Sequence, residues 1–237
     1  MVRLLVTRPQ PEASETAGRL MALDIEAVVE PLLIARTLPN TLPPAAGFAA
    51  LAVTSGQALR ALAERGDLAS LTGLPLYAVG DRTAAFARTL GFTTVHSAGG
   101  DLPALVALLA GAGLSGPVLY PAALHRSGDL AHALAPHGIM VITTAVYEMV
   151  PMTSLSRDLA GAGIDGVLLY SRRTAETFVA LTRGMSGIAA MAMLCLSEAV
   201  AQPLMAAHFT RIGLADHPSE QAMLALALSF ARGQNPA

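Results

Sequence analysis

The chain has 237 residues, of which 53% are hydrophobic and 14% are charged, so it can bury one large core or two ordinary ones and is too apolar for intrinsic disorder. Its formal net charge of −2 provides no overall attraction to nucleic acid. All 15 basic residues are arginines, which excludes a Schiff-base lysine and a Walker A loop.

The first half of the chain predicts strands that alternate with helices. The chain opens with a strand, where we expect no secretory leader. The first helix is indicated by apolar residues on one face: Ala13, Ala17, Leu20 and Met21. The predicted strands are Val2–Thr7, Glu26–Ile34, Ala49–Thr54, Leu76–Val79 and Thr93–His96. The predicted helices are Glu12–Leu23 and three that begin near Gln57, Arg82 and Asp101, with Gly66 and Gly91 as terminators.

The longest uncharged stretch, Leu102–Leu124, has the length of a membrane span. It contains three prolines and three glycines, which predict a helix, a loop and a strand in its place. The single cysteine, Cys195, lies in the apolar run "MLCLS" and reads as a core residue, which excludes a disulfide framework. We therefore expect a soluble, cytoplasmic protein.

The second half repeats the pattern of the first at an offset of about 114 residues. The segment "VLLYSRRTAETFVALTRG" corresponds to "LAVTSGQALRALAERG", and both end in Arg-Gly. The best linker candidates, Ala35–Gly47 and Glu148–Gly163, fall inside the two copies rather than between them. This placement is natural if the first two strands of one copy complete the parallel sheet of the other.

Polar residues gather where the predicted strands end, which is the edge at which such sheets bind ligands. They are Thr7, Arg8, Ser55, Gln57, Asp81, Arg82, Thr83, His125, Arg126, Ser127, Ser171, Arg172, Arg173, Thr174, Ser197 and Glu198. Each hydroxyl or Asp alone is explained by helix capping. Capping does not explain the arginines, so we expect a donor-rich cleft between two such edges, suited to a polyanion.

Other chemistries fit less well. The first strand is not followed by G-x-G-x-x-G, and neither Ser55 nor Ser171 lies in a G-x-S-x-G elbow. His125, Asp129 and His132 share a potential helix face, but no third strong metal ligand accompanies the histidines, so we interpret this as a solvated face.

The ordered set of segments resembles the uroporphyrinogen-III synthase family over essentially the whole chain. The segments that carry the resemblance are "LLVTRP", "EPLLIA", "VTSGQALRAL", "YAVGDRTAAFARTLGF", "GGDLPAL", "VYEMVP", "LLYSRRTAETF" and "HPSEQAML". The resemblance implies an α/β protein with two flavodoxin-like parallel-sheet domains, one inserted in the other and joined by a two-stranded hinge. Domain 1 would comprise residues 1–35 and 153–237, domain 2 residues 40–147, and the linkers residues 36–39 and 148–152.

The same resemblance implies a lyase that needs no cofactor or metal. Hydroxymethylbilane, a linear tetrapyrrole with eight carboxylates, would lose water and close with inversion of ring D to give uroporphyrinogen III. Tyr147 matches the family's candidate acid, and Ser55, Thr83 and Ser171 match its site hydroxyls. We expect further substrate contacts from Thr7, Arg8, Gln57, Arg126, Arg172 and Ser197. The expected protein is a monomer without nucleic-acid or membrane partners, in transient contact with hydroxymethylbilane synthase.

Two departures from the family pattern leave an alternative open. Gln57 stands where many relatives have Asn, and Ser197-Glu198-Ala199-Val200 replaces a Gly followed by a Thr pair. The alternative is a degenerate, non-catalytic tetrapyrrole binder or regulator of the same fold. A bilobal sugar- or amino-acid-binding protein is disfavoured because the chain has no Trp to form an aromatic platform.

Overall fold

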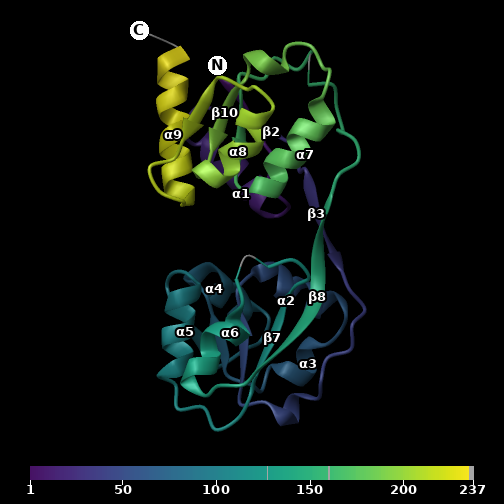
Figure 1. Cartoon of the computed structure of the whole chain (residues 1–237), viewed down its shortest axis with the longest axis vertical. Helices are drawn as coiled ribbons and strands as arrows, with labels where there is room; N and C mark the ends of the chain where they lie inside the picture. The colour runs from purple at the N-terminus through teal and green to yellow at the C-terminus, as the bar shows by residue number, and fades with distance from the viewer. Residues whose placement is uncertain (127, 160, 235–237) are drawn as a thin grey trace. The chain divides into compact units, whose positions relative to one another are not determined.

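A computed structural model describes residues 1–126, 128–159 and 161–234. The chain forms two compact units (Figure 1): unit 1 comprises Met1–Ile34 and Val150–Ala237, and unit 2 comprises Ala35–Met149. The chain crosses between the units twice, within strands β3 (Leu33–Thr37) and β8 (Val141–Pro151), which are hydrogen-bonded neighbours.

Unit 1 contains a five-stranded sheet in the order β11-β10-β9-β1-β2, with parallel pairing throughout the described registers. Its strands are β1 (Arg3–Val6), β2 (Glu26–Val29), β9 (Gly166–Leu169), β10 (Ala192–Cys195) and β11 (Ile212–Leu214). Its helices are α1 (Glu12–Met21), α7 (Arg172–Thr182), the 3-10 turn Ile188–Ala190, α8 (Glu198–Ala206) and α9 (Glu220–Gln234).

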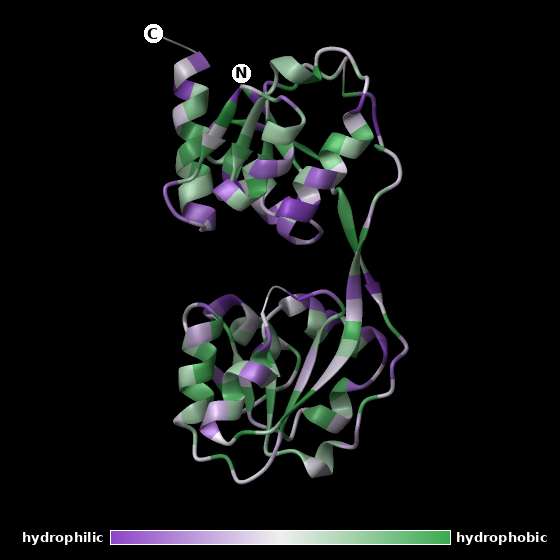
Figure 2. Ribbon diagram, viewed as in Figure 1, coloured by the Kyte–Doolittle hydropathy of each residue, from purple (hydrophilic) through white to green (hydrophobic). Residues whose placement is uncertain are grey.

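Side-chain alternation along the strands of unit 1 builds a separate core on each face of the sheet. Val167 and Leu169 of β9 pack with Phe178 of α7 in one core, whereas Leu168 between them packs in the other core, which includes residues of α1 and α9. This two-sided burial is the reason that the strands read as continuous apolar runs. Figure 2 shows these runs as hydrophobic strands among helices with hydrophilic stretches.

Unit 2 is organised in the same way around the sheet β3-β8-β7-β4-β5-β6. Its remaining strands are β4 (Ala50–Val53), β5 (Leu76–Ala78), β6 (Val95–Ser97) and β7 (Val118–Ala123). Its helices are α2 (Gly56–Glu64), α3 (Leu68–Leu71), α4 (Asp81–Thr89), α5 (Leu102–Ala110) and α6 (Leu130–Leu134), with 3-10 turns at Ala45–Gly47 and Ala135–His137. One core packs against α2 and α4, and the other against α5 and α6.

The sheet orders explain where the linkers fall in the sequence. In unit 1, β1 and β2 of the first repeat join β9, β10 and β11 of the second. In unit 2, β7 and β8 of the second repeat join β4, β5 and β6 of the first. Apart from the additional edge strand β3 in unit 2, both sheets therefore combine strands from the two copies in the same order, that of flavodoxin-like sheets.

Most predicted elements are present, and one prediction was wrong. The single strand expected at Glu26–Ile34 is two strands, β2 and β3, that lie in different sheets. The interruption falls at Glu30-Pro31, where proline has no N–H to continue a ladder and the Glu30 carboxylate accepts a hydrogen bond from Ser156 N at 2.6 Å. The short helix α3 was not predicted.

The uncharged stretch Leu102–Leu124 forms α5, a loop and β7, as predicted. Among the described residues, no helix is both long enough and apolar enough to cross a membrane.

Candidate functional site

Two of the predicted hydroxyls cap helices that follow directly from buried strands. Ser55 is the N-cap of α2 and accepts a hydrogen bond from Gln57 N at 3.1 Å. Ser171 is the N-cap of α7 and accepts from Thr174 N, also at 3.1 Å, with its Oγ 2.7 Å from Thr174 Oγ1. A serine hydroxyl that accepts one hydrogen bond still carries a proton, so capping does not prevent it from donating to a ligand.

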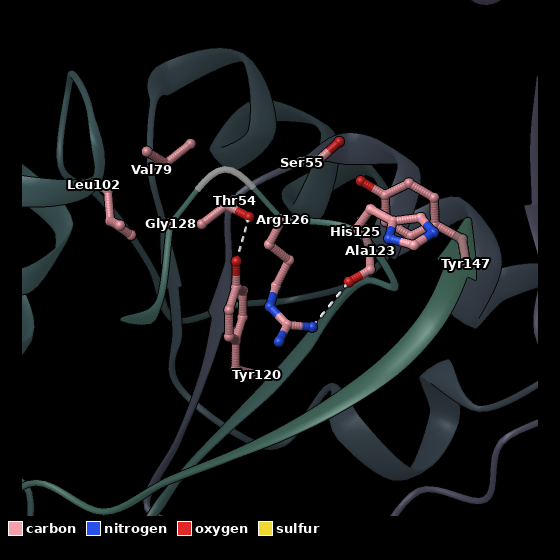
Figure 3. Close-up of a pocket in the computed structure, with 10 residues that line it drawn as sticks. All are labelled: Thr54, Ser55, Val79, Leu102, Tyr120, Ala123, His125, Arg126, Gly128 and Tyr147. Atoms are coloured by element: carbon pink, nitrogen blue, oxygen red, sulfur yellow. Dashed lines mark hydrogen bonds between the residues drawn. The ribbon is translucent and has the colours of Figure 1, made fainter. Parts of the chain in front are cut away.

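Unit 2 contains a cavity of about 330 Å³ at the carboxyl edge of its sheet (Figure 3). It is lined by Thr54, Ser55, Val79, Leu102, Tyr120, Ala123, His125, Arg126, Gly128 and Tyr147. Three predicted site residues, Ser55, Arg126 and Tyr147, thus meet in one cavity although they come from the α2 N-cap, the loop after β7, and β8. Ser127, noted with them in the sequence, lies outside the described residues.

An irregularity in β8 places Tyr147 at this cavity. Ala122 pairs with Ala145, but Ala123 pairs with Tyr147, so Val146 is the extra residue of a bulge. Consecutive strand residues normally face opposite sides, whereas here Val146 and Tyr147 belong to the same core cluster. The bulge therefore places Tyr147 on the same face of the sheet as Val146, where it lines the cavity and is only 7% exposed.

Two hydrogen bonds hold other parts of the cavity lining. The hydroxyls of Thr54 and Tyr120 lie 2.9 Å apart, and an Nη1–H of Arg126 donates to Ala123 O at 3.1 Å. Gly128 allows its loop to approach Leu102 closely, because a Cβ there would lie 2.5 Å from Leu102 Cδ2.

The polar groups of the cavity favour an anion. The described lining residues provide one guanidinium, one imidazole and four hydroxyls, and none of them carries a carboxylate. Guanidinium and hydroxyl groups are donors suited to carboxylates. Elsewhere in the described parts of the chain, no group of three or more His, Cys, Asp or Glu is arranged to hold a metal ion.

The other predicted residues of unit 2 lie outside this lining. Gln57 is in the first turn of α2, and its N–H donates to Ser55 Oγ. Thr83 is in the first turn of α4, whose N-cap is Gly80. Both positions are partly buried and follow the carboxyl ends of neighbouring strands, β4 and β5.

Thr7 and Arg8 are engaged by the fold of unit 1. The Thr7 hydroxyl is fully buried and donates to Leu168 O at 2.6 Å. The Arg8 guanidinium pairs with Glu220, donates to Thr16 Oγ1 at 3.2 Å and lies 4.3 Å from the centre of the Tyr170 ring. Burial, followed by the nearby Glu220 carboxylate, raises the pKa of Tyr170 well above its usual range.

Arg172 and Ser197 lie at the first turns of the packed helices α7 and α8. Arg172 is exposed, and its donors reach Glu176 Oε1 at 3.0 Å and Gln202 Oε1 at 3.3 Å. Ser197 occupies the N-cap position of α8, but its side chain makes no capping hydrogen bond. Glu198, the first residue of α8, is exposed.

Sequence reasoning assigned no role to three polar residues of the cavity. Thr54 and Tyr120 belong to or directly follow apolar strands, so they read as core. His125 was listed at the strand edge and, with Asp129 and His132, interpreted as a solvated face. All three are exposed, but His125 precedes α6 instead of sharing a helix face with the others, and it also lines the cavity. The signal that identifies it is its position two residues after β7, beside Arg126.

Comparisons with known proteins agree with this architecture. A sequence model of the uroporphyrinogen-III synthase HemD family matches residues 14–225. The structure of a uroporphyrinogen-III synthetase from Helicobacter pylori 26695 is similar at a TM-score of 0.68 and 22% identity, covering 97% of this chain and 99% of that one. A mutant uroporphyrinogen III synthase from the extremely thermophilic bacterium Thermus thermophilus is similar at a TM-score of 0.54 and 16% identity, covering 99% and 100%. A search of curated protein sequences finds no match.

Proposed function

Because this chain belongs to the uroporphyrinogen-III synthase HemD family, we propose that it is the lyase that closes hydroxymethylbilane to uroporphyrinogen III with inversion of ring D and loss of water. The observation that carries the proposal is the family match over residues 14–225. It favours the enzyme over the non-catalytic binder. The cavity of unit 2, with its donors and without a carboxylate among its described lining residues, supports a polycarboxylate substrate.

In the first chemical step, the C–O bond of the hydroxymethyl group breaks and the oxygen takes a proton to leave as water. We assign this proton to the Tyr147 hydroxyl, since the ring is enclosed in the wall of the cavity. The cationic azafulvene that remains is stabilised by the electron pair of the pyrrole nitrogen. The substituted α-carbon of ring D bonds to it and gives a spiro intermediate, and the older bond from that carbon to its bridging methylene then breaks. The freed methylene bonds to the other α-carbon of ring D, which loses its proton to the Tyr147 oxygen, so the protein supplies no net proton.

The remaining task of the protein is to hold a flexible chain in the one geometry that inverts ring D. Positioning of this kind lowers the activation free energy, because the reacting carbons are already held close together and correctly oriented. We assign substrate carboxylates to donors at the carboxyl edges of both sheets: Ser55, Gln57, Thr83, Arg126, Ser171, Arg172 and Ser197. For Thr7 and Arg8 we propose a structural role, because their donors are used inside unit 1.

We further propose that the protein acts in the cytoplasm as a monomer and receives its unstable substrate from hydroxymethylbilane synthase. Light scattering of the purified chain tests the oligomeric state. A co-sedimentation experiment with the synthase tests the contact.

One assay tests the main proposal. Purified protein is supplied with hydroxymethylbilane, and the type III and type I products are separated by chromatography after oxidation. We expect type III to dominate, whereas the reaction without protein gives type I. A product that is type I in both reactions would contradict the proposed function.

A further inference from the structure

We propose that the cavity of unit 2 is a carboxylate subsite in which protonated His125 joins Arg126 in binding one carboxylate of the ligand, so that the ligand binds more tightly as His125 gains its proton. The identity of the ligand rests on the proposed function. The site itself rests on the residues that line the cavity.

The backbone fixes where these two side chains lie. Strand β7 ends at Ala123, and Leu124 N donates to Tyr147 O at 2.8 Å, which ties the start of the following loop to β8. His125 and Arg126 come next, and both side chains line the cavity (Figure 3). An imidazole and a guanidinium, adjacent in the sequence, are thus delivered to one cavity by a single anchored turn.

Among the residues that the structure describes, no buried partner holds either side chain. His125 and Arg126 are both exposed, and the hydrogen bond from Arg126 to Ala123 O uses one of the five N–H groups of a guanidinium. The remaining donors of Arg126 can therefore meet a bound carboxylate without breaking a contact of the fold. His125 and Arg126 can also turn toward a ligand at little cost in packing.

No carboxylate of the described lining competes for these donors. The titratable or charged groups that face His125 across the cavity are Arg126 from its own loop, Tyr120 from β7 and Tyr147 from β8. Thr54, Ser55, Val79 and Leu102, which come from the other elements that line the cavity, are uncharged. The described lining residues thus supply no counter-charge for the pair, whereas a carboxylate of the ligand would.

Binding and protonation are consequently coupled. A carboxylate bound between His125 and Arg126 favours the imidazolium, and by reciprocity the imidazolium favours the carboxylate.

The size of the cavity sets what enters it. At about 330 Å³, it is at the small end of the roughly 300–1,000 Å³ range of small-molecule sites. One pyrrole ring with its acidic side arms fits such a volume, whereas a whole tetrapyrrole does not. Val79 and Leu102 offer apolar surface to the ring, and the Thr54–Tyr120 hydroxyl pair offers a polar end.

The test measures the affinity of uroporphyrinogen III, kept reduced, for the full chain between pH 5.5 and 8.0. For the unchanged protein we expect affinity to fall about tenfold over this range, the size of one hydrogen bond to a charged group. His125→Gln should flatten the profile to the level that the unchanged protein has at pH 8.0. Arg126→Gln should weaken binding at every pH. His132→Gln, on the exposed side of α6 and outside the cavity, is the matched control and should keep the full profile.

The outcomes separate this inference from the proposed function. If the unchanged protein forms type III product but His125→Gln keeps the full pH profile, the subsite is wrong and the function stands. If no type III product forms but the ligand binds with a profile that His125→Gln abolishes, the subsite stands and the function is wrong. The thermal melting temperature of each variant is measured as well, to test whether a change in affinity comes from unfolding.

Discussion

The hydroxyl oxygens of Thr54 and Tyr120 lie 2.9 Å apart, so the residue after β4 is linked to the middle of the neighbouring strand β7 at the cavity of unit 2. The ring of Tyr120 is 3% exposed and packs in the core against α5 and α6. The pair therefore connects the wall of the cavity to the packing beneath it.

Tyr120→Phe tests this connection. It keeps the ring and removes one partner of the hydrogen bond, so we expect the free energy of unfolding to fall by about 1 kcal/mol. Turnover should fall only slightly, because the hydroxyl positions the wall and is not the assigned acid. Chemical denaturation and the type III assay measure the two effects. The control is Tyr77→Phe, on β5 and outside the cavity lining. If both variants lost turnover equally, the Tyr120 hydroxyl would have no specific role in the reaction.

Tyr147→Phe tests the assigned proton donor. General acids typically accelerate reactions by about 10²–10⁴-fold, and since the pyrrole already stabilises the azafulvene, we expect a loss of turnover near the lower end. Product affinity and thermal stability should change little, as the ring remains in place. Turnover within a factor of about two of the unchanged protein would mean that positioning alone carries the reaction.

Salt tests the role of charge in binding. Since the proposed ligand is a polycarboxylate that meets arginines and hydroxyl donors, its affinity should fall as ionic strength rises and shortens the Debye length, which is about 10 Å at 0.1 M. Titration calorimetry with uroporphyrinogen III from low to high salt measures the slope. Arg126→Gln should give a shallower slope, and a flat response of the unchanged protein would indicate an apolar binding mode.

Glu30→Gln tests the buried carboxylate between β2 and β3. Glu30 is 2% exposed and accepts hydrogen bonds from Ser156 N, Ser156 Oγ and Arg157 Nε. Loss of charge-assisted hydrogen bonds at a buried site should lower the free energy of unfolding by about 2 kcal/mol. Glu26→Gln, on β2 just before Glu30, breaks a partly exposed ion pair with Arg3 and should cost less than about 0.5 kcal/mol. Similar urea midpoints for the two variants would contradict the prediction that the Glu30 carboxylate stabilises the fold more than that of Glu26.

Alkaline pH should destabilise the fold through Cys195. Burial raises the pKa of this thiol to about 12, above the value of about 8.5 in an unfolded chain. The unfolded state therefore loses its proton first, so the stabilising contribution is complete below about pH 8.5 and is lost as the pH rises toward 12. Between pH 8 and pH 10 we expect a loss of about 2 kcal/mol. The absence of lysine keeps this range free of ammonium titration from side chains.

Cys195→Ala provides the comparison for this prediction. It lacks the thiol, so its free energy of unfolding should change less between pH 8 and pH 10, whatever its absolute stability. If the free energies of unfolding of the two proteins fell equally between pH 8 and pH 10, the loss would not come from the Cys195 thiol and the prediction would be wrong. A thiol reagent at pH 8 should also label the native protein far more slowly than the denatured one.

The sequence by itself determined the elements whose causes are local. Apolar runs such as Val167–Leu169 form buried strands because both faces of a parallel sheet are covered. Asp101 begins α5 because its carboxylate accepts from Ala104 N at 3.0 Å, only three residues away. The repeated order of strands and helices likewise predicted two parallel sheets, and a family resemblance over the whole chain named the function.

The tertiary structure alone decided which distant residues meet. Arg8 reads as a ligand-binding arginine until Glu220, far along the chain, neutralises it. The run Glu26–Ile34 reads as one strand until Glu30 binds Ser156 and the chain passes to another sheet. Tyr147 lies on the same face of the sheet as Val146 because β8 bulges there, and a bulge is set by pairing with β7. Propensity, capping and periodicity act over a few residues, whereas strand register and ion pairing depend on partners that only packing brings together.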